Sequence, residues 1–146
     1  MKKWFKPHPL ISLDQGPSMT LSPFLLKALN SLMTAAFVFS VVVQYNDPDP
    51  IRWMLIYGAA AAACILSLRG KLRWTVPAAI GLVALVWAGS IAPRVIGQVR
   101  FADMFQSFEM KDPMVEEARE MGGLLIVWAW MAVLVAVSRK AKPREG

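Results

Sequence analysis

The chain has 146 residues; 56% of them are hydrophobic, 18% are charged, and the formal net charge is +6. The apolar residues form long blocks without the polar face of a surface helix, which favours an integral membrane protein over a soluble helical bundle. Period-2 alternation is absent, so a transmembrane β-barrel is not expected. The basic residues show no patch with a reading element, and we expect no nucleic-acid partner.

Four apolar blocks follow one another along the chain and predict an all-α fold, a four-helix transmembrane bundle. A helix needs roughly 20 apolar residues to cross a hydrocarbon core about 30 Å thick, and each block meets or nearly meets that length. We expect the four helices at about 23–45, 51–68, 74–93 and 113–138. The transmembrane domain then covers 23–138, between a cytoplasmic N-terminal arm at 1–22 and a basic cytoplasmic tail at 139–146.

The first block begins at Ser22 and Pro23, residue types that suit the N-cap and the first position of a helix, and ends before Pro48 and Pro50. Its short link to the second block predicts an antiparallel hairpin of the first two helices. We expect the polar side chains within the first helix to hydrogen-bond to neighbouring helices: Asn30, Ser31, Thr34 and Ser40. Glycine and alanine in all four blocks predict a close approach of the helix backbones.

The link carries an amide and two carboxylates, Asn46, Asp47 and Asp49, immediately after the first apolar block. Asparagine and aspartate side chains bond to nearby backbone N–H groups in tight turns. We therefore expect Asx-type turns at Asn46 and Asp47, at one mouth of the bilayer.

The longest loop lies between the third and fourth blocks. Phe101, Met104, Phe105 and Phe108 recur in it at helical spacing, with polar and charged residues between them. This pattern predicts a short amphipathic helix in the outer membrane interface; an ordinary loop with aromatic anchors is the alternative. The fourth helix is expected to begin outside the membrane and to raise four charged residues above the bilayer: Glu116, Glu117, Arg119 and Glu120.

Lysine and arginine are distributed unevenly over the two sides of the predicted bundle. With four crossings, eleven of these residues lie on the side of both termini and five lie on the other side. Basic residues mark the cytoplasmic side of membrane proteins, so we expect both termini in the cytoplasm and most acidic residues outside. The predicted location is a bacterial inner membrane.

Two stretches of the sequence are specific enough to compare with known families. The first, LLKALNSLMTAAFVFSVVVQYNDPDPIRWMLIYGAAAA, contains the run Q-x-N-D-P-D, and the second is VEEAREMGGLLIVWAW. Together they resemble the transmembrane protein 220 family, over about residues 25–138. The resemblance implies a small multi-helix membrane protein and brings no activity with it. It marks the residues Gln44, Asn46, Asp47, Pro48, Asp49, Glu116, Glu117, Arg119, Glu120, Gly123 and Leu124.

The two motifs lie at the same predicted membrane face, where their carboxylates repel one another unless a cation lies between them. One arrangement is a structural cap in which arginines supply the counter-charges: Arg52, Arg94, Arg100 and Arg119. The other is a bound hard cation, Ca²⁺ or Mg²⁺, because these metals take carboxylate oxygens as ligands. The candidate metal ligands are Asp47, Asp49, Glu116 and Glu120.

The candidate residues for a ligand-binding or structural cap are therefore Gln44, Asn46, Asp47, Asp49, Glu116, Glu117, Arg119 and Glu120. The chain has one histidine, His8, and one cysteine, Cys64, which cannot assemble a zinc site or a disulfide framework within one chain. No catalytic residue is assigned, and no cofactor other than Ca²⁺ or Mg²⁺ is expected.

Three functional hypotheses stay open. The first is a non-catalytic scaffold or accessory subunit of a membrane complex. The second is a binding protein for a hard cation or small ligand at the acidic cap. The third is a membrane enzyme in which Asp47 or Glu120 acts as a general base. The expected partners are the lipid bilayer and either another membrane protein or a second copy of the chain.

Overall fold

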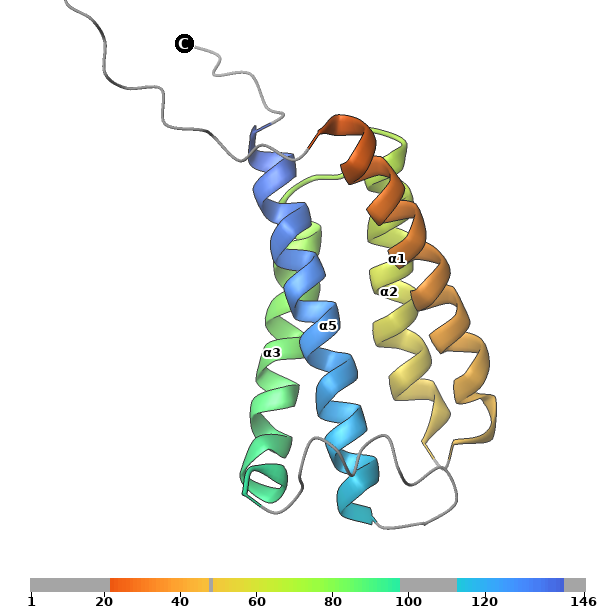
Figure 1. The fold of residues 1–146 in the computed structure, drawn as a ribbon, viewed down its shortest axis with the longest axis vertical. Helices are drawn as coiled ribbons and strands as arrows, with labels where there is room; N and C mark the ends of the chain where they lie inside the picture. The colour runs from red at the N-terminus through yellow and green to blue at the C-terminus, as the bar shows by residue number, and fades with distance from the viewer. Residues whose placement is uncertain (1–21, 48, 98–112, 141–146) are drawn as a thin grey trace, which may run out of the picture.

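The computed structural model describes residues 22–47, 49–97 and 113–140, and these residues are helical apart from short links (Figure 1). Four long helices follow in chain order: α1 (Pro23–Val43), α2 (Pro50–Leu68), α3 (Thr75–Val95) and α5 (Pro113–Lys140). A short 3₁₀ turn, η1 (Gln44–Asn46), continues α1. The described residues form no strand, and the predicted all-α fold is confirmed.

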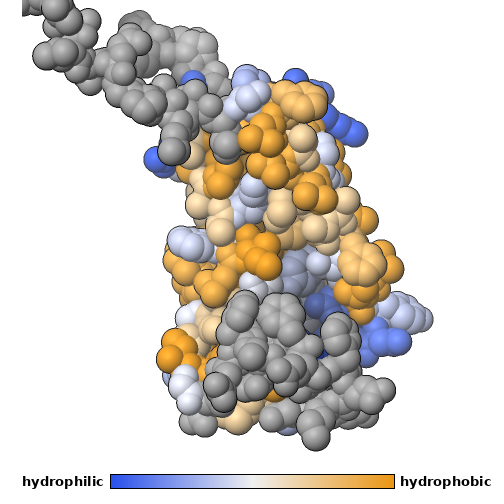
Figure 2. All heavy atoms as spheres, viewed as in Figure 1, coloured by the Kyte–Doolittle hydropathy of each residue, from blue (hydrophilic) through white to orange (hydrophobic). Residues whose placement is uncertain are grey.

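All four helices are long and apolar enough to cross a membrane. Large apolar side chains point outward from them, such as Phe24 at 81% and Phe39 at 67% exposure on α1. Figure 2 shows apolar residues over the middle of the body and hydrophilic residues near its two ends. Such a band of exposed apolar side chains would be unfavourable in water and suits contact with lipid.

The ends of the helices follow local chemistry. Ser22 precedes α1 but its side chain makes no capping hydrogen bond; its carbonyl instead accepts from the Leu26 N–H at 3.0 Å. The third helix continues through Pro93, beyond its predicted end, because the Ile96 N–H still closes the last turn on the Ala92 carbonyl at 2.9 Å. The interfacial helix predicted around 101–108 lies outside the described residues.

The helices pack as two pairs, α1 with α2 and α3 with α5, and Figure 1 shows both pairs running along the length of the bundle. Helix α2 makes the close backbone contacts between the pairs, touching α3 and α5 much more lightly than it touches α1. The first two helices form the antiparallel hairpin that the short link predicts.

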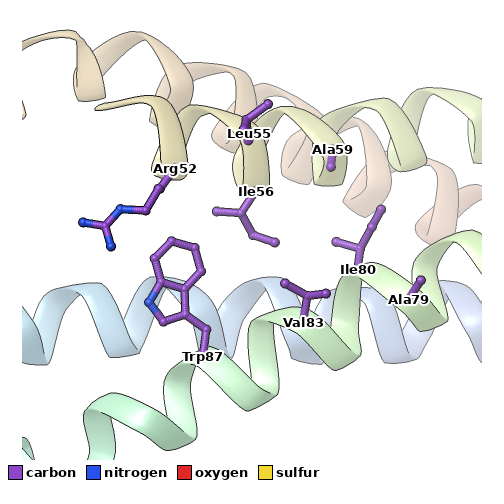
Figure 3. A pocket seen from close by; sticks show the side chains of 8 residues that line it. All are labelled: Arg52, Leu55, Ile56, Ala59, Ala79, Ile80, Val83 and Trp87. Atoms are coloured by element: carbon purple, nitrogen blue, oxygen red, sulfur yellow. The ribbon is translucent and has the colours of Figure 1, made fainter. Parts of the chain in front are cut away.

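Light contact between α2 and α3 leaves a cavity of about 510 Å³ between them, which we call the α2–α3 groove (Figure 3). The α2 side contributes Arg52, Leu55, Ile56 and Ala59, and the α3 side contributes Ala79, Ile80, Val83 and Trp87. Arg52 is the single charged residue among these eight. The groove is therefore apolar along most of its length and has one cationic end.

Small residues bring the helix backbones together in the interior. A Cβ atom built on Gly81 of α3 would lie 3.2 Å from Met131 Cβ of α5. A Cβ atom built on Gly123 of α5 would overlap the hydroxyl of Tyr57 on α2. These two contacts confirm the predicted close approach of helices at glycine.

One buried side chain ties three helices together. Asn30 of α1 is 4% exposed; its Nδ2 donates to the Cys64 carbonyl of α2 at 2.9 Å, and its Oδ1 accepts from Trp130 Nε1 of α5 at 3.1 Å. The prediction of bonds between helices is correct for Asn30. The three hydroxyl side chains of α1 donate to backbone carbonyls of their own helix, as serine and threonine commonly do: Ser31, Thr34 and Ser40.

Candidate functional site

The four helix ends near the α1–α2 link form what we call the acidic end of the bundle. A cavity of about 420 Å³, the acidic cleft, opens there. It is lined by Asp47, Asp49, Arg52, Trp53, Trp87, Ile91, Arg94, Pro113, Glu116, Glu117 and Glu120. These residues come from the α1–α2 link, the start of α2, the end of α3 and the start of α5. The cleft therefore brings together two motifs that lie nearly 70 residues apart in the sequence.

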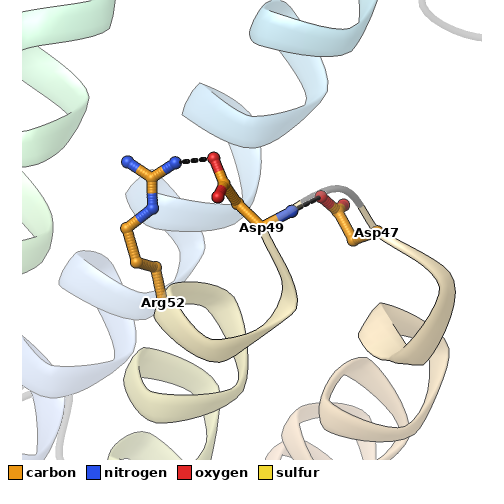
Figure 4. A network of polar contacts seen from close by, with 3 residues as sticks. All are labelled: Asp47, Asp49 and Arg52. Atoms are coloured by element: carbon orange, nitrogen blue, oxygen red, sulfur yellow. Dashed lines mark hydrogen bonds and ion pairs between the residues drawn. The ribbon is translucent and has the colours of Figure 1, made fainter.

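The α1–α2 link contributes Asp47 and Asp49 to one wall of the cleft, and Figure 4 shows these two side chains with Arg52. The Asp49 N–H donates to Asp47 Oδ1 at 3.2 Å, which is the Asx-type bond expected of Asp47. Asp49 stands before Pro50, the first residue of α2, but its side chain does not cap the helix. It pairs instead with Arg52 one turn later, and Figure 4 shows the guanidinium and carboxylate facing each other. The side chain of each aspartate thus has a partner within the link or the first turn of α2.

The opposite wall is formed by the end of α3 and the start of α5. Arg94 Nε lies 3.1 Å from Glu117 Oε2, and their side chains are 61% and 31% exposed. An ion pair with that much exposure contributes about 0–1 kcal/mol to stability. Its main effect is to hold the end of α3 against the first turns of α5.

Aromatic rings form the inner boundary of the cleft. Trp53 is 3% exposed and stacks on Trp87 with ring centroids 4.5 Å apart, so α2 and α3 meet there. Tyr57 continues the stack below Trp53 at 6.2 Å. The sequence contains no spacing that pairs Trp53 with Trp87, because the two residues lie on different helices and only the fold joins them.

The cleft is strongly acidic. Five carboxylates and two guanidinium groups line it, a formal excess of three negative charges among the described residues. Glu120 is half-buried, and the charges of four nearby side chains act on its carboxylate: Asp47, Glu116, Glu117 and Arg52. Like charges held this close repel one another, and a cationic group entering the cleft would relieve that repulsion.

The structure separates the candidate residues into two groups. Five of them line the cleft: Asp47, Asp49, Glu116, Glu117 and Glu120. The other three do not: Gln44 is half-buried in η1, while Asn46 and Arg119 are exposed. Of the predicted counter-charges, Arg52 and Arg94 make ion pairs and Arg100 lies outside the described residues.

The described residues contain no group of three histidine, cysteine, aspartate or glutamate side chains placed to hold a metal ion. Two of the carboxylates are instead directed at arginines, Asp49 at Arg52 and Glu117 at Arg94. The four-carboxylate Ca²⁺ or Mg²⁺ site stays a prediction.

Comparison with known proteins gives one family. The family model described as "Transmembrane family 220, helix" matches residues 36–136. The matched part contains the α1–α2 link and the start of α5, and hence both walls of the cleft. No solved structure matches the chain.

Proposed function

This chain belongs to the transmembrane 220 family, and we propose that it is a non-catalytic scaffold or accessory subunit of a membrane complex. The chain is an integral membrane protein with four helices able to span the bilayer. In the proposed arrangement both termini are cytoplasmic, the acidic cleft faces the extracytoplasmic side, and the membrane is a bacterial inner membrane. The cleft receives a cationic group of the partner, which is a membrane protein or a second copy.

The observation that supports this proposal is the excess negative charge of the cleft among the described residues. Asp47 and Asp49 are held by the turn and by Arg52, and Glu117 is held by Arg94. Neighbouring groups of the protein explain the geometry of these contacts without a substrate or another reacting group. A cationic group that docks in the cleft gains electrostatic complementarity with its carboxylates.

Cross-linking inside the membrane tests the proposal. A photoreactive residue at Pro113, an exposed residue that lines the cleft, should give a discrete cross-linked product of larger mass. The double variant Asp47→Asn with Glu120→Gln should remove that product, whereas Arg73→Gln at the opposite end of the bundle should keep it. An unchanged product in the double variant would contradict the proposal, and so would a product confined to lipid-facing positions.

A second candidate function is the binding of Ca²⁺ or Mg²⁺ in the cleft, favoured by five carboxylates around one cavity. An ion that binds only the folded protein must raise the thermal unfolding midpoint by mass action. We expect a rise after Ca²⁺ or Mg²⁺ replaces chelator, and its loss in Asp47→Asn and in Glu120→Gln. A midpoint that no ion moves would reject this candidate. The general-base hypothesis for Asp47 or Glu120 rests on the sequence alone.

A further inference from the structure

The α2–α3 groove and the acidic cleft adjoin, because Arg52 and Trp87 line both. In Figure 3 these two residues stand at one end of the groove, and Ala59 and Ala79 stand at the other. The two cavities therefore meet at these two side chains. The lining changes from apolar side chains facing the membrane, through one guanidinium group, to a set of carboxylates.

The groove opens toward lipid and has the length of part of one hydrocarbon chain. Leu55 on one side is 68% exposed and Val83 on the other is 56% exposed, so both rims face outward. Along α2 the groove runs from Arg52 to Ala59, about 10 Å at 1.5 Å per residue. Small side chains at Ala59 and Ala79 leave the space that a larger residue would fill.

We propose that the groove and the cleft together bind one phospholipid with a primary-amine head group. An acyl chain lies in the α2–α3 groove, the phosphate contacts Arg52, and the ammonium group lies among the carboxylates. The protein groups follow the order of the parts of the lipid: apolar side chains for the acyl chain, then Arg52 for the phosphate, then carboxylates for the amine. The lipid ammonium and a partner's cationic group would occupy the same carboxylates, so the two proposals are alternatives for the cleft, and lipid retention and cross-linking test them separately.

Charge complementarity selects this lipid class. An arginine presents five N–H donors, and Asp49 engages Nη2, which leaves other donors for a phosphate. A primary ammonium donates three hydrogen bonds, and carboxylates such as Glu116 and Glu120 are suitable acceptors. A choline head group has no N–H to donate. A head group with only negative charge would meet repulsion from the carboxylates.

The half-buried ring of Trp87 marks the depth of the head group. Indole rings favour the boundary between hydrocarbon and polar head groups. Trp87 lines both cavities and therefore lies where the chain would meet the phosphate. This depth agrees with the position of Arg52 at the same end of the groove (Figure 3).

Native mass spectrometry of the purified protein tests the proposal. The protein is incubated in detergent with equal amounts of phosphatidylethanolamine, phosphatidylcholine and phosphatidylglycerol, and the lipid that stays bound is identified. We expect one bound phosphatidylethanolamine, preferred over phosphatidylcholine by about tenfold, as one charge-assisted hydrogen bond gives. Equal retention of the three lipids, a preference for phosphatidylglycerol, or no bound lipid would each overturn the proposal.

Matched variants separate the site from general lipid contact. Ala59→Trp fills the groove and should reduce bound lipid of every class by about tenfold or more. Ala62→Trp makes the same change on the same helix at an exposed residue that does not line the groove, and it should retain lipid as the unmodified protein does. Equal retention by the two variants would overturn the site.

Charge variants test the head-group assignment without filling the groove. Glu116→Gln with Glu120→Gln should bring the ratio of phosphatidylethanolamine to phosphatidylcholine close to one while a lipid still binds. Arg52→Gln should lower retention of both lipids, because both carry the phosphate. Each variant is first shown to be folded by its thermal unfolding midpoint. An unchanged ratio in the double glutamate variant would overturn the amine assignment.

Discussion

Gly123→Ala tests a close contact between the two helix pairs. The added Cβ would overlap the Tyr57 hydroxyl, and Tyr57 is 8% exposed and stacked between Phe37 and Trp53. Overpacking of this kind costs about 1–3 kcal/mol, and the higher helix propensity of alanine offsets about 1 kcal/mol of it. We expect a net loss of roughly 1 kcal/mol in the free energy of unfolding.

A double-mutant cycle isolates the overlap. With Tyr57→Phe the hydroxyl is gone, and the next atom that the new Cβ would meet is the ring Cζ at 3.4 Å, an ordinary van der Waals contact. Gly123→Ala should therefore become neutral or slightly stabilising in the Tyr57→Phe background. The two changes should show a coupling energy of about 1–2 kcal/mol.

The assay is reversible unfolding in mixed micelles, followed by tryptophan fluorescence. Gly89→Ala is the matched control, because a Cβ there would meet nothing within 4 Å, and it should not destabilise the protein. Equal effects of Gly123→Ala in both backgrounds would refute the reasoning. So would a loss at Gly89 as large as the loss at Gly123.

Three further predictions concern the described interior and cleft, each measured as a change in unfolding free energy by the same assay. Asn30→Leu leaves the Trp130 N–H and the Cys64 carbonyl without their partner and should cost about 1–3 kcal/mol, whereas Ser31→Ala, which removes an exposed hydroxyl, should cost under about 0.5 kcal/mol. Trp53→Ala opens the aromatic boundary of the cleft and should cost about 3–5 kcal/mol. Arg94→Gln removes an exposed ion pair and should cost under about 1 kcal/mol, so a larger loss would mean that this pair supports the fold.

The sequence was sufficient for the helices because transmembrane helices depend on local composition. Long apolar blocks and the prolines at 23 and 113 mark where two helices start, and the structure begins α1 and α5 at those residues, while α2 begins at Pro50, one residue before the predicted 51. Hydropathy carries no comparable signal for the end of α3, where hydrogen bonding carries the helix two residues past the predicted boundary. The Asx-type bond of Asp47 was also predictable, since it involves a neighbour two residues away.

Pairings across helices were less accessible to sequence reasoning. The shared face of Glu116 and Glu120 follows from helical spacing, and both residues line the cleft. The inclusion of Glu117 in the same cleft depends on its ion pair with Arg94 of another helix. The Trp53–Trp87 stack depends on how α2 lies against α3, which no periodicity encodes. The α2–α3 groove is likewise a property of packing, because alanine in a membrane helix signals close contact as readily as a cavity.

The charges at the acidic end contribute little to the stability of the fold, which favours a role for them in binding. The ion pairs of Arg52 and Arg94 are exposed and contribute about 0–1 kcal/mol each, too little to account for five carboxylates around one cleft. The formal excess of three negative charges among the described residues that line the cleft causes repulsion that reduces the stability of the isolated protein. Apolar residues or single caps would close these helix ends with less repulsion. A cationic group in the cleft would attract the carboxylates that otherwise repel one another. Arg52 lies at the mouth of the apolar groove, where it would contact the phosphate of a lipid whose acyl chain lies in the groove and whose amine is that cationic group.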